Sequence, residues 1–81
     1  MNKEIIAELD KILPVVARVH GENHPELQEV VELYKELKEN PSKDVLEKLR
    51  NVTADYNVPE DACPTYEKTY HDLAQLDKEL A

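Results

Sequence analysis

Residues 64–80 read PTYEKTYHDLAQLDKEL, a stretch with a repeating pattern at Tyr66, Thr69, Leu73, Leu76 and Leu80. These positions are three or four residues apart, so they share one face of an α-helix. Proline is favoured in the first turn of a helix, where its missing amide hydrogen is not needed. The stretch therefore predicts a helix opened by Pro64, whose buried face packs against other helices as a coiled-coil stripe does.

The N-terminal segment predicts another amphipathic helix, running from Asn2 to His20. Asn2 is a good N-cap, and Gly21, the only glycine of the chain, is expected to end the helix in the left-handed conformation. Pro14 removes a backbone donor, so the helix should kink or restart there. The apolar positions are Ile5, Ile6, Leu9, Ile12 and Leu13, followed by Val15, Val16, Ala17 and Val19.

Two further helices are expected between these. One begins at Asn23 or His24, with Pro25 in its first turn, and ends before Pro41; the other is capped by Ser42. Their apolar stripes are Leu27, Val30, Val31, Tyr34 and Leu37 in the first, and Val45, Leu46, Leu49, Val52 and Tyr56 in the second. Short connections between such helices predict an all-α fold, a small antiparallel bundle of three to four helices in a single domain, residues 1–81.

Charge and composition exclude several classes of function. The 81 residues include 18 acids and 10 bases, giving a formal charge of -8 that repels nucleic-acid phosphates and anionic lipid. No apolar run is long enough to span a bilayer, and the N-terminus lacks the apolar core of a signal peptide. The single Cys63 has no partner for an internal disulfide. We therefore expect a cytoplasmic protein that binds neither nucleic acid nor membrane.

His20, Glu22 and His24 form the one local cluster of metal-ligand residue types. Two histidines four apart on a helix can grip one metal, but Gly21 and Pro25 are expected to break the helix between them. His20 is then either a metal ligand or a helix-terminal histidine beside its own carbonyls, and His24 is either a ligand or a solvated or capping side chain.

The remaining candidates have structural interpretations. His71 is expected on the surface, and Glu60 and Asp61 near the N-terminus of the last helix, where its dipole stabilises negative charge. Cys63 is expected to be a small buried hydrophobe. The four tyrosines should fill the core with their hydroxyls at its edge. No nucleophile–base pair is evident, which favours binding over catalysis.

Two stretches follow one another in an unusual combination. Residues 16–27 read VARVHGENHPEL, and residues 49–63 read LRNVTADYNVPEDAC, followed by Thr65, Tyr66, Tyr70 and Leu73. In this order they resemble the "VHG…HPEL" segment, and the segment leading into the last helix, of the iron–sulfur cluster repair di-iron proteins (the RIC family, with a hemerythrin-like domain). The resemblance covers most of residues 12–80.

The resemblance implies a four-helix bundle that holds two irons through histidines and bridging carboxylates. It also implies a role in repairing iron–sulfur clusters damaged by oxidative or nitrosative stress. His20 matches a metal-ligand position of the family, whereas His24 belongs to the motif without being carried over as a ligand.

The chain also departs from the family pattern. The central "HLxKEE" ligand helix has no counterpart between Leu37 and Leu49, and Met1 to Leu13 contains no histidine. The chain stops at Ala81, just before the "HIxxEN" ligand pair would follow. One matched ligand cannot hold two irons, because such sites draw Glu and His from several helices.

Two functions remain open. The first is an abbreviated member of the repair family that binds iron weakly, or only within an assembly, with His20 as its metal ligand. The second is a metal-free helical module that forms a homo-oligomer or binds a protein partner through its apolar faces. The ligand count favours an isolated chain without a di-iron centre.

Overall fold

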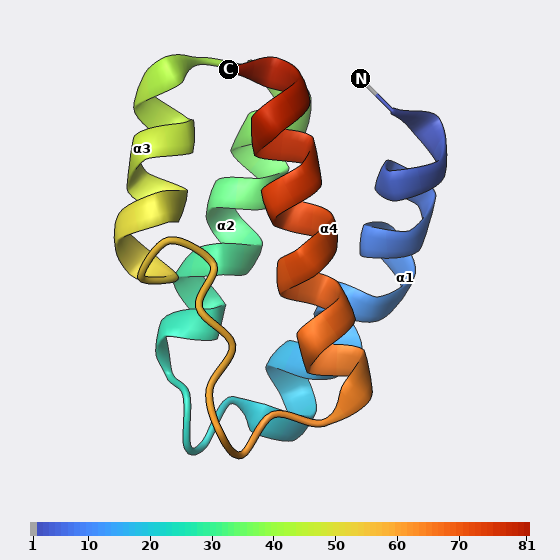
Figure 1. Ribbon diagram of the computed structural model, residues 1–81, viewed down its shortest axis with the longest axis vertical. Coiled ribbons are helices and arrows are strands. Elements are labelled where there is room, and N and C mark those ends of the chain that lie inside the picture. Colours follow the sequence, from blue (N-terminus) through green and yellow to red (C-terminus); the bar gives the residue numbers. More distant parts are fainter. Residues whose placement is uncertain (1) are drawn as a thin grey trace.

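The computed structural model describes residues 2–81 and consists of four α-helices (Figure 1). They are α1 (Lys3–His20), α2 (Glu26–Glu39), α3 (Lys43–Val52) and α4 (Pro64–Leu80). Along the chain α1, α2, α3 and α4 alternate in direction, so the expected antiparallel all-α bundle is confirmed. None of the helices described is long and apolar enough to cross a membrane.

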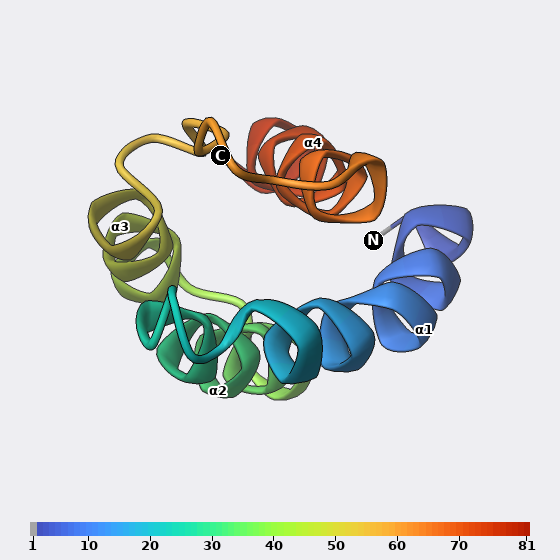
Figure 2. The ribbon, with the colours of Figure 1, turned by 90° about the horizontal axis from the view of Figure 1, so that it is seen from below.

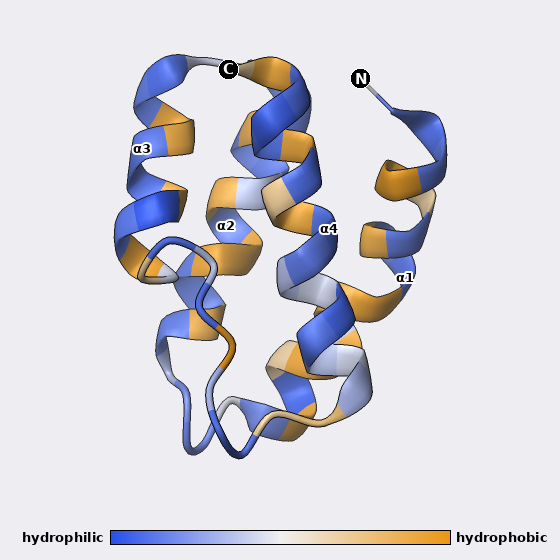
Figure 3. Ribbon diagram, viewed as in Figure 1, coloured by the Kyte–Doolittle hydropathy of each residue, from blue (hydrophilic) through white to orange (hydrophobic). Residues whose placement is uncertain are grey.

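The helices α1, α2 and α3 form an arc, and α4 lies across its open side (Figure 2). Each helix has an apolar stripe (Figure 3), and these stripes meet in one core. Tyr66 and Leu76 of α4 are fully buried there, as are Leu9 of α1 and Leu27 of α2. Because α4 contributes buried side chains toward the other helices of the arc, its stripe closes the bundle.

Two of the predicted helix starts are confirmed by their caps. Asn2 Oδ1 accepts hydrogen bonds from the amides of Glu4 and Ile5 at 3.0 and 3.2 Å. Ser42 Oγ accepts one from the amide of Val45 at 3.2 Å. Each cap satisfies amide donors that lack partners in the first helical turn. Pro64 opens α4 as predicted.

Burial along the helices differs in detail from the sequence pattern. Leu33 is buried although it was not expected to be, and Val15 and Val19 are exposed. The half-buried positions of the predicted stripes are Ile5, Ile6, Ile12, Ala17, Val31, Val52, Tyr56 and Leu80. In a bundle of 81 residues, the face toward the core is narrow, so apolar residues at its margins stay partly in solvent.

The boundary between α1 and α2 differs from the prediction. Pro14 lies inside α1, which continues through it and bends rather than restarting (Figure 1). Gly21 has a φ of −60°, so the left-handed conformation predicted for it is wrong. A Cβ atom at Gly21 would collide with the carbonyl oxygen of Ala17. Glycine is therefore needed here for close backbone approach. The second helix begins at Glu26, with Pro25 as its N-cap.

Replacing Gly21 by alanine tests this close approach. Alanine usually stabilises a glycine site of right-handed conformation, but here its Cβ meets a backbone oxygen. We expect Gly21→Ala to lower the free energy of unfolding by about 1 kcal/mol or more, measured by urea denaturation. Glu22→Ala, at an exposed neighbouring position, serves as the control. A stabilised Gly21→Ala variant would show that the backbone relaxes freely.

The segment after α3 turns sharply instead of extending the helix to Tyr56. Thr53 Oγ1 donates to the carbonyl of Leu49 at 2.6 Å and accepts from the amide of Tyr56 at 2.9 Å. Ala54, Asp55 and Tyr56 have φ of 52°, 59° and 62°, the left-handed region. The prediction that α3 carries Tyr56 is therefore wrong. Left-handed residues other than glycine cost roughly 1–2 kcal/mol each, so other contacts must hold the turn.

Asp77 of α4 supplies these contacts from a buried position. The Tyr56 hydroxyl donates to Asp77 Oδ2 at 2.7 Å, and the Arg50 guanidinium donates to both carboxylate oxygens at 2.6 and 2.8 Å. Burial opposes ionisation of Asp77, yet the donors on Arg50 and Tyr56 outweigh it and hold its pKa below the ordinary 3.8. Asp77 thus joins α3, the left-handed turn and α4.

Asp77→Asn should destabilise the bundle in a pH-dependent way. The asparagine amide has no charge and only one acceptor oxygen, so none of the three hydrogen bonds to Asp77 stays charge-assisted, which we expect to cost about 1–3 kcal/mol of unfolding free energy near neutral pH. Because the folded-state pKa of Asp77 is depressed, its contribution is full above the ordinary pKa of 3.8 and is lost as pH falls through the folded value. Urea denaturation across this range should show the gap between wild type and variant shrinking in acid. A gap that does not change with pH would contradict this.

Candidate functional site

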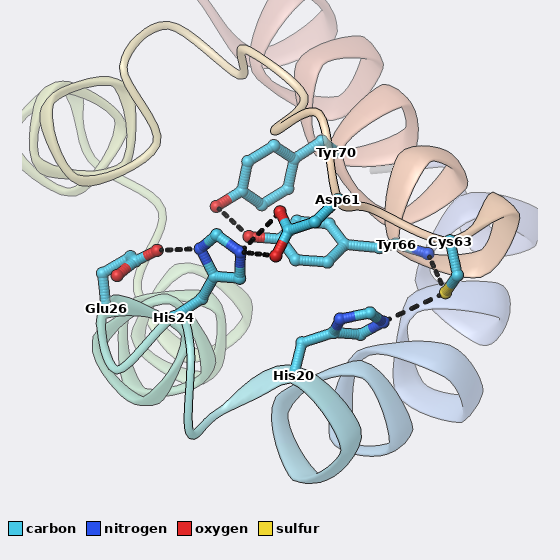
Figure 4. A network of polar contacts seen from close by, with 7 residues as sticks. All are labelled: His20, His24, Glu26, Asp61, Cys63, Tyr66 and Tyr70. Atoms are coloured by element: carbon cyan, nitrogen blue, oxygen red, sulfur yellow. Dashed lines mark hydrogen bonds and ion pairs between the residues drawn. The ribbon is translucent and has the colours of Figure 1, made fainter.

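Seven side chains meet at the end of the bundle where the α1–α2 turn approaches the segment before α4 (Figure 4). We call them the histidine cluster. Its members are His20, His24, Glu26, Asp61, Cys63, Tyr66 and Tyr70. The two stretches that carry the family resemblance, far apart in the sequence, therefore lie side by side in the fold.

The ring of Tyr66 is the centre of the histidine cluster. Its centroid lies 5.0 Å from that of His20 and 5.5 Å from that of His24, and both histidine rings meet it edge to face. The Tyr66 hydroxyl donates to the Tyr70 hydroxyl at 3.5 Å. Burial is the main cause that raises the pKa of Tyr66, so its hydroxyl stays neutral. The aromatic ring fixes both histidines to the start of α4.

His24 is held between two carboxylates. Its Nε2 lies 2.9 and 3.0 Å from the two oxygens of Asp61, and its Nδ1 lies 3.0 Å from Glu26 Oε1. The hydrogen bond to Asp61 is the main cause that raises the pKa of His24 above 6.5, against a smaller effect of burial. The predicted solvated or capping role is wrong, because the side chain is only 17% exposed and Pro25 is the N-cap. His24 instead clamps the α1–α2 turn to the segment before α4.

Asp61→Asn tests this clamp. Without the carboxylate, the pKa of His24 should fall, which a proton NMR titration of the imidazole resonances would measure. Because the folded-state pKa is raised, the clamp stabilises fully below the ordinary pKa of 6.5 and is lost as pH rises through the folded value. The variant should therefore lose more unfolding free energy at pH below 6.5 than in alkali. Glu60→Gln, an exposed neighbour, should leave the titration unchanged.

His20 faces the thiol of Cys63. The distance between His20 Nε2 and Cys63 Sγ is 3.2 Å, and both residues are half-buried. Cys63 is the N-cap of α4, where its Sγ accepts the amide hydrogen of Tyr66 at 3.4 Å. Cys63 packs against the core but is only half-buried, so the prediction of a small buried hydrophobe is confirmed in part, and the polar contacts of its sulfur were not predicted. A nitrogen and a sulfur ligand atom from different elements are brought together, a pairing that the sequence analysis did not anticipate.

The other predicted residues lie outside the cluster. Glu22 and Glu60 are exposed, so the local trio of His20, Glu22 and His24 does not converge. His71 is exposed, as predicted, and borders a shallow hollow of about 560 Å³ between α4 and the loop before it. The carboxylates that do join the cluster, on Asp61 and Glu26, follow the two prolines that shape its turns.

The residues present do not fit a di-iron centre. Within residues 2–81, no three or more His, Cys, Asp and Glu side chains are grouped so that they could hold a metal ion. A buried carboxylate oxygen without a hydrogen-bond partner does exist, Asp72 Oδ2. Asp72 follows Cys63 by nine residues, about 13 Å along the axis of α4, which is too far to join His20. The bridging carboxylates of a di-iron site therefore have no counterpart beside His20.

Comparison with protein-family models, curated proteins and solved structures finds no match to this chain. The resemblance to the cluster repair proteins rests on the two sequence motifs alone, and the chemistry of the site rests on its own geometry.

Proposed function

We propose that this chain is a small helical binding module, related to the cluster repair proteins, that serves the stress response by holding a metal cation at His20 within an assembly. The observation that supports this most is the placement of His20. The one residue that matches a family ligand is half-buried at the end of the bundle, with Nε2 only 3.2 Å from the Cys63 thiol. Imidazole nitrogen and thiolate sulfur are both common metal ligands.

A single cation, not a pair of irons, suits this arrangement. The di-iron sites of helical bundles use carboxylates and histidines from several helices. Here both nitrogens of His24 are already bonded to Asp61 and Glu26, which leaves the pair of His20 and Cys63. Two ligand atoms from one chain bind a cation weakly, so an assembly is needed to complete the coordination.

Binding is favoured over turnover by the surroundings of the pair. Cys63 and His20 are residue types that act as nucleophile and base, but an activated pair needs a third group that orients the base. Within the described part of the chain, the side-chain hydrogen bond of His20 is the one to Cys63. The sulfur is also engaged as the N-cap of α4.

The second candidate function is metal-free self-association. Val15 and Val19 lie four residues apart on α1 and are 42% and 63% exposed. Half-buried Ile12 continues the same stripe toward the N-terminus. Apolar side chains gathered on a surface are a mark of protein–protein contact.

Anaerobic loading with Fe(II), followed by desalting and iron counting, tests the metal-binding proposal. We expect the wild type to retain less than one iron per chain and His20→Ala to retain none, because His20 is the ligand that the resemblance assigns. His71→Ala removes an exposed histidine outside the cluster and should behave as wild type.

Three outcomes of this loading would contradict the proposal. Retention by His20→Ala equal to that of wild type would mean that His20 is not the ligand. Two irons per chain, with a near-ultraviolet oxo-bridge band after air exposure, would mean that a di-iron site forms after all. A wild type that retains no cation would favour the metal-free module.

A further inference from the structure

We infer that His20 and Cys63 are the two ligands that each chain contributes to a tetrahedral, zinc-type site shared between two copies of this chain. The inference rests on the proposed function and makes it specific. It names Cys63 as a ligand, Zn(II) as the class of cation, and a second copy as the source of the remaining ligands.

The separation of the two ligand atoms suits a tetrahedral cation. Zinc is bound at about 2.0 Å by histidine nitrogen and about 2.3 Å by cysteine sulfur, so a tetrahedral angle places the two atoms about 3.5 Å apart. His20 Nε2 and Cys63 Sγ are 3.2 Å apart. A shift of a few tenths of an ångström, well within the freedom of two half-buried side chains, would admit the ion.

The chemistry of the ligands favours zinc over a carboxylate-bridged iron pair. A thiolate and an imidazole are ligands typical of zinc, whereas di-iron bundles rely on carboxylate oxygens. The carboxylate of Asp61 lies in the same cluster, but both of its oxygens contact His24. The pair that remains is therefore a nitrogen–sulfur one.

Two ligands are half of a structural zinc site, which almost always has four protein ligands. A two-fold axis through the ion would bring the same pair from a second copy and give a Cys₂His₂ set, since such an interface uses the same patch on both chains. The surface beside the pair suits this contact. Val19, next to His20, is 63% exposed, and Pro64, next to Cys63, is exposed as well.

Charge makes this pairing depend on the cation. Each copy carries a formal charge of -8, so two copies repel one another when their surfaces are closer than about the Debye length. A divalent ion between two thiolates contributes the attraction that the bare surfaces lack. We therefore expect monomers without metal and dimers with it.

Cobalt(II) is a spectroscopic probe for such a site, because tetrahedral cobalt with thiolate ligands absorbs in the visible and near-ultraviolet. The wild-type chain, reduced and anaerobic, would be titrated with Co(II) alone and then with Zn(II) in competition. We expect a thiolate charge-transfer band that saturates at one cobalt per two chains and is abolished by Zn(II). Sedimentation velocity should show the change from monomer to dimer at the same ratio.

Cys63→Ser separates the metal ligand from the helix cap. A serine oxygen can still accept the Tyr66 amide, so α4 and the circular dichroism should be preserved. The variant should lose the charge-transfer band, and its affinity should fall by more than the roughly 10- to 100-fold that loss of an outer-shell partner causes. His20→Ala should do the same, and His71→Ala should match the wild type.

The results that overturn the shared site are distinct from those that overturn metal binding itself. One cobalt per monomer, wild-type affinity in Cys63→Ser, or an equal population of dimer without metal would each refute it. If His20→Ala abolishes Fe(II) retention while Cys63→Ser binds cobalt normally, the proposed function stands and the Cys63 ligand is wrong. If the wild type binds neither ion, both are wrong.

Discussion

Tyr66 is buried where the last turn of α1, the turn into α2 and the first turn of α4 meet, and its ring contacts both His20 and His24. An apolar stripe alone would let α4 slide by one turn along the arc, because leucines recur at similar spacing. The Tyr66 ring at one end and the Asp77 carboxylate near the other remove that freedom. Each joins α4 to partners that lie at one level only, so the register of α4 depends on these two side chains.

Cys63 links the fold and the candidate site. The same sulfur caps α4 and faces His20, so the start of the helix and the position of the sulfur are set together. The His24 clamp holds the loop that carries Cys63, through Asp61 only two residues earlier. A site built in this way is positioned by backbone and by buried aromatic packing, although His20 and Cys63 are themselves only half-buried.

The helices could be predicted because their signals are local. Asn2, Ser42 and Pro64 mark helix starts, and spacing at three and four residues marks the buried faces. The candidate site could not be predicted in this way, because its contacts join residues that are 37 and 43 positions apart in the sequence. The order of the two motifs along the chain was the one sequence signal that pointed to this site. The buried, paired carboxylate of Asp77 could have been predicted. Asp77 lies on the same helix face as Leu73 and Leu76, where a buried charge needs a partner. The close approach of Gly21 to the carbonyl oxygen of Ala17 could not be predicted, because it depends on how the backbone is placed at the end of α1.

The left-handed turn at Ala54, Asp55 and Tyr56 is a place where substitution could stabilise the chain. These three consecutive residues adopt a backbone that glycine and asparagine adopt at little cost. Ala54 is exposed, so its side chain is under little packing constraint. A designer seeking a more robust scaffold would begin at that position, where a change of residue type relaxes the backbone and leaves both ends of α4 as they are.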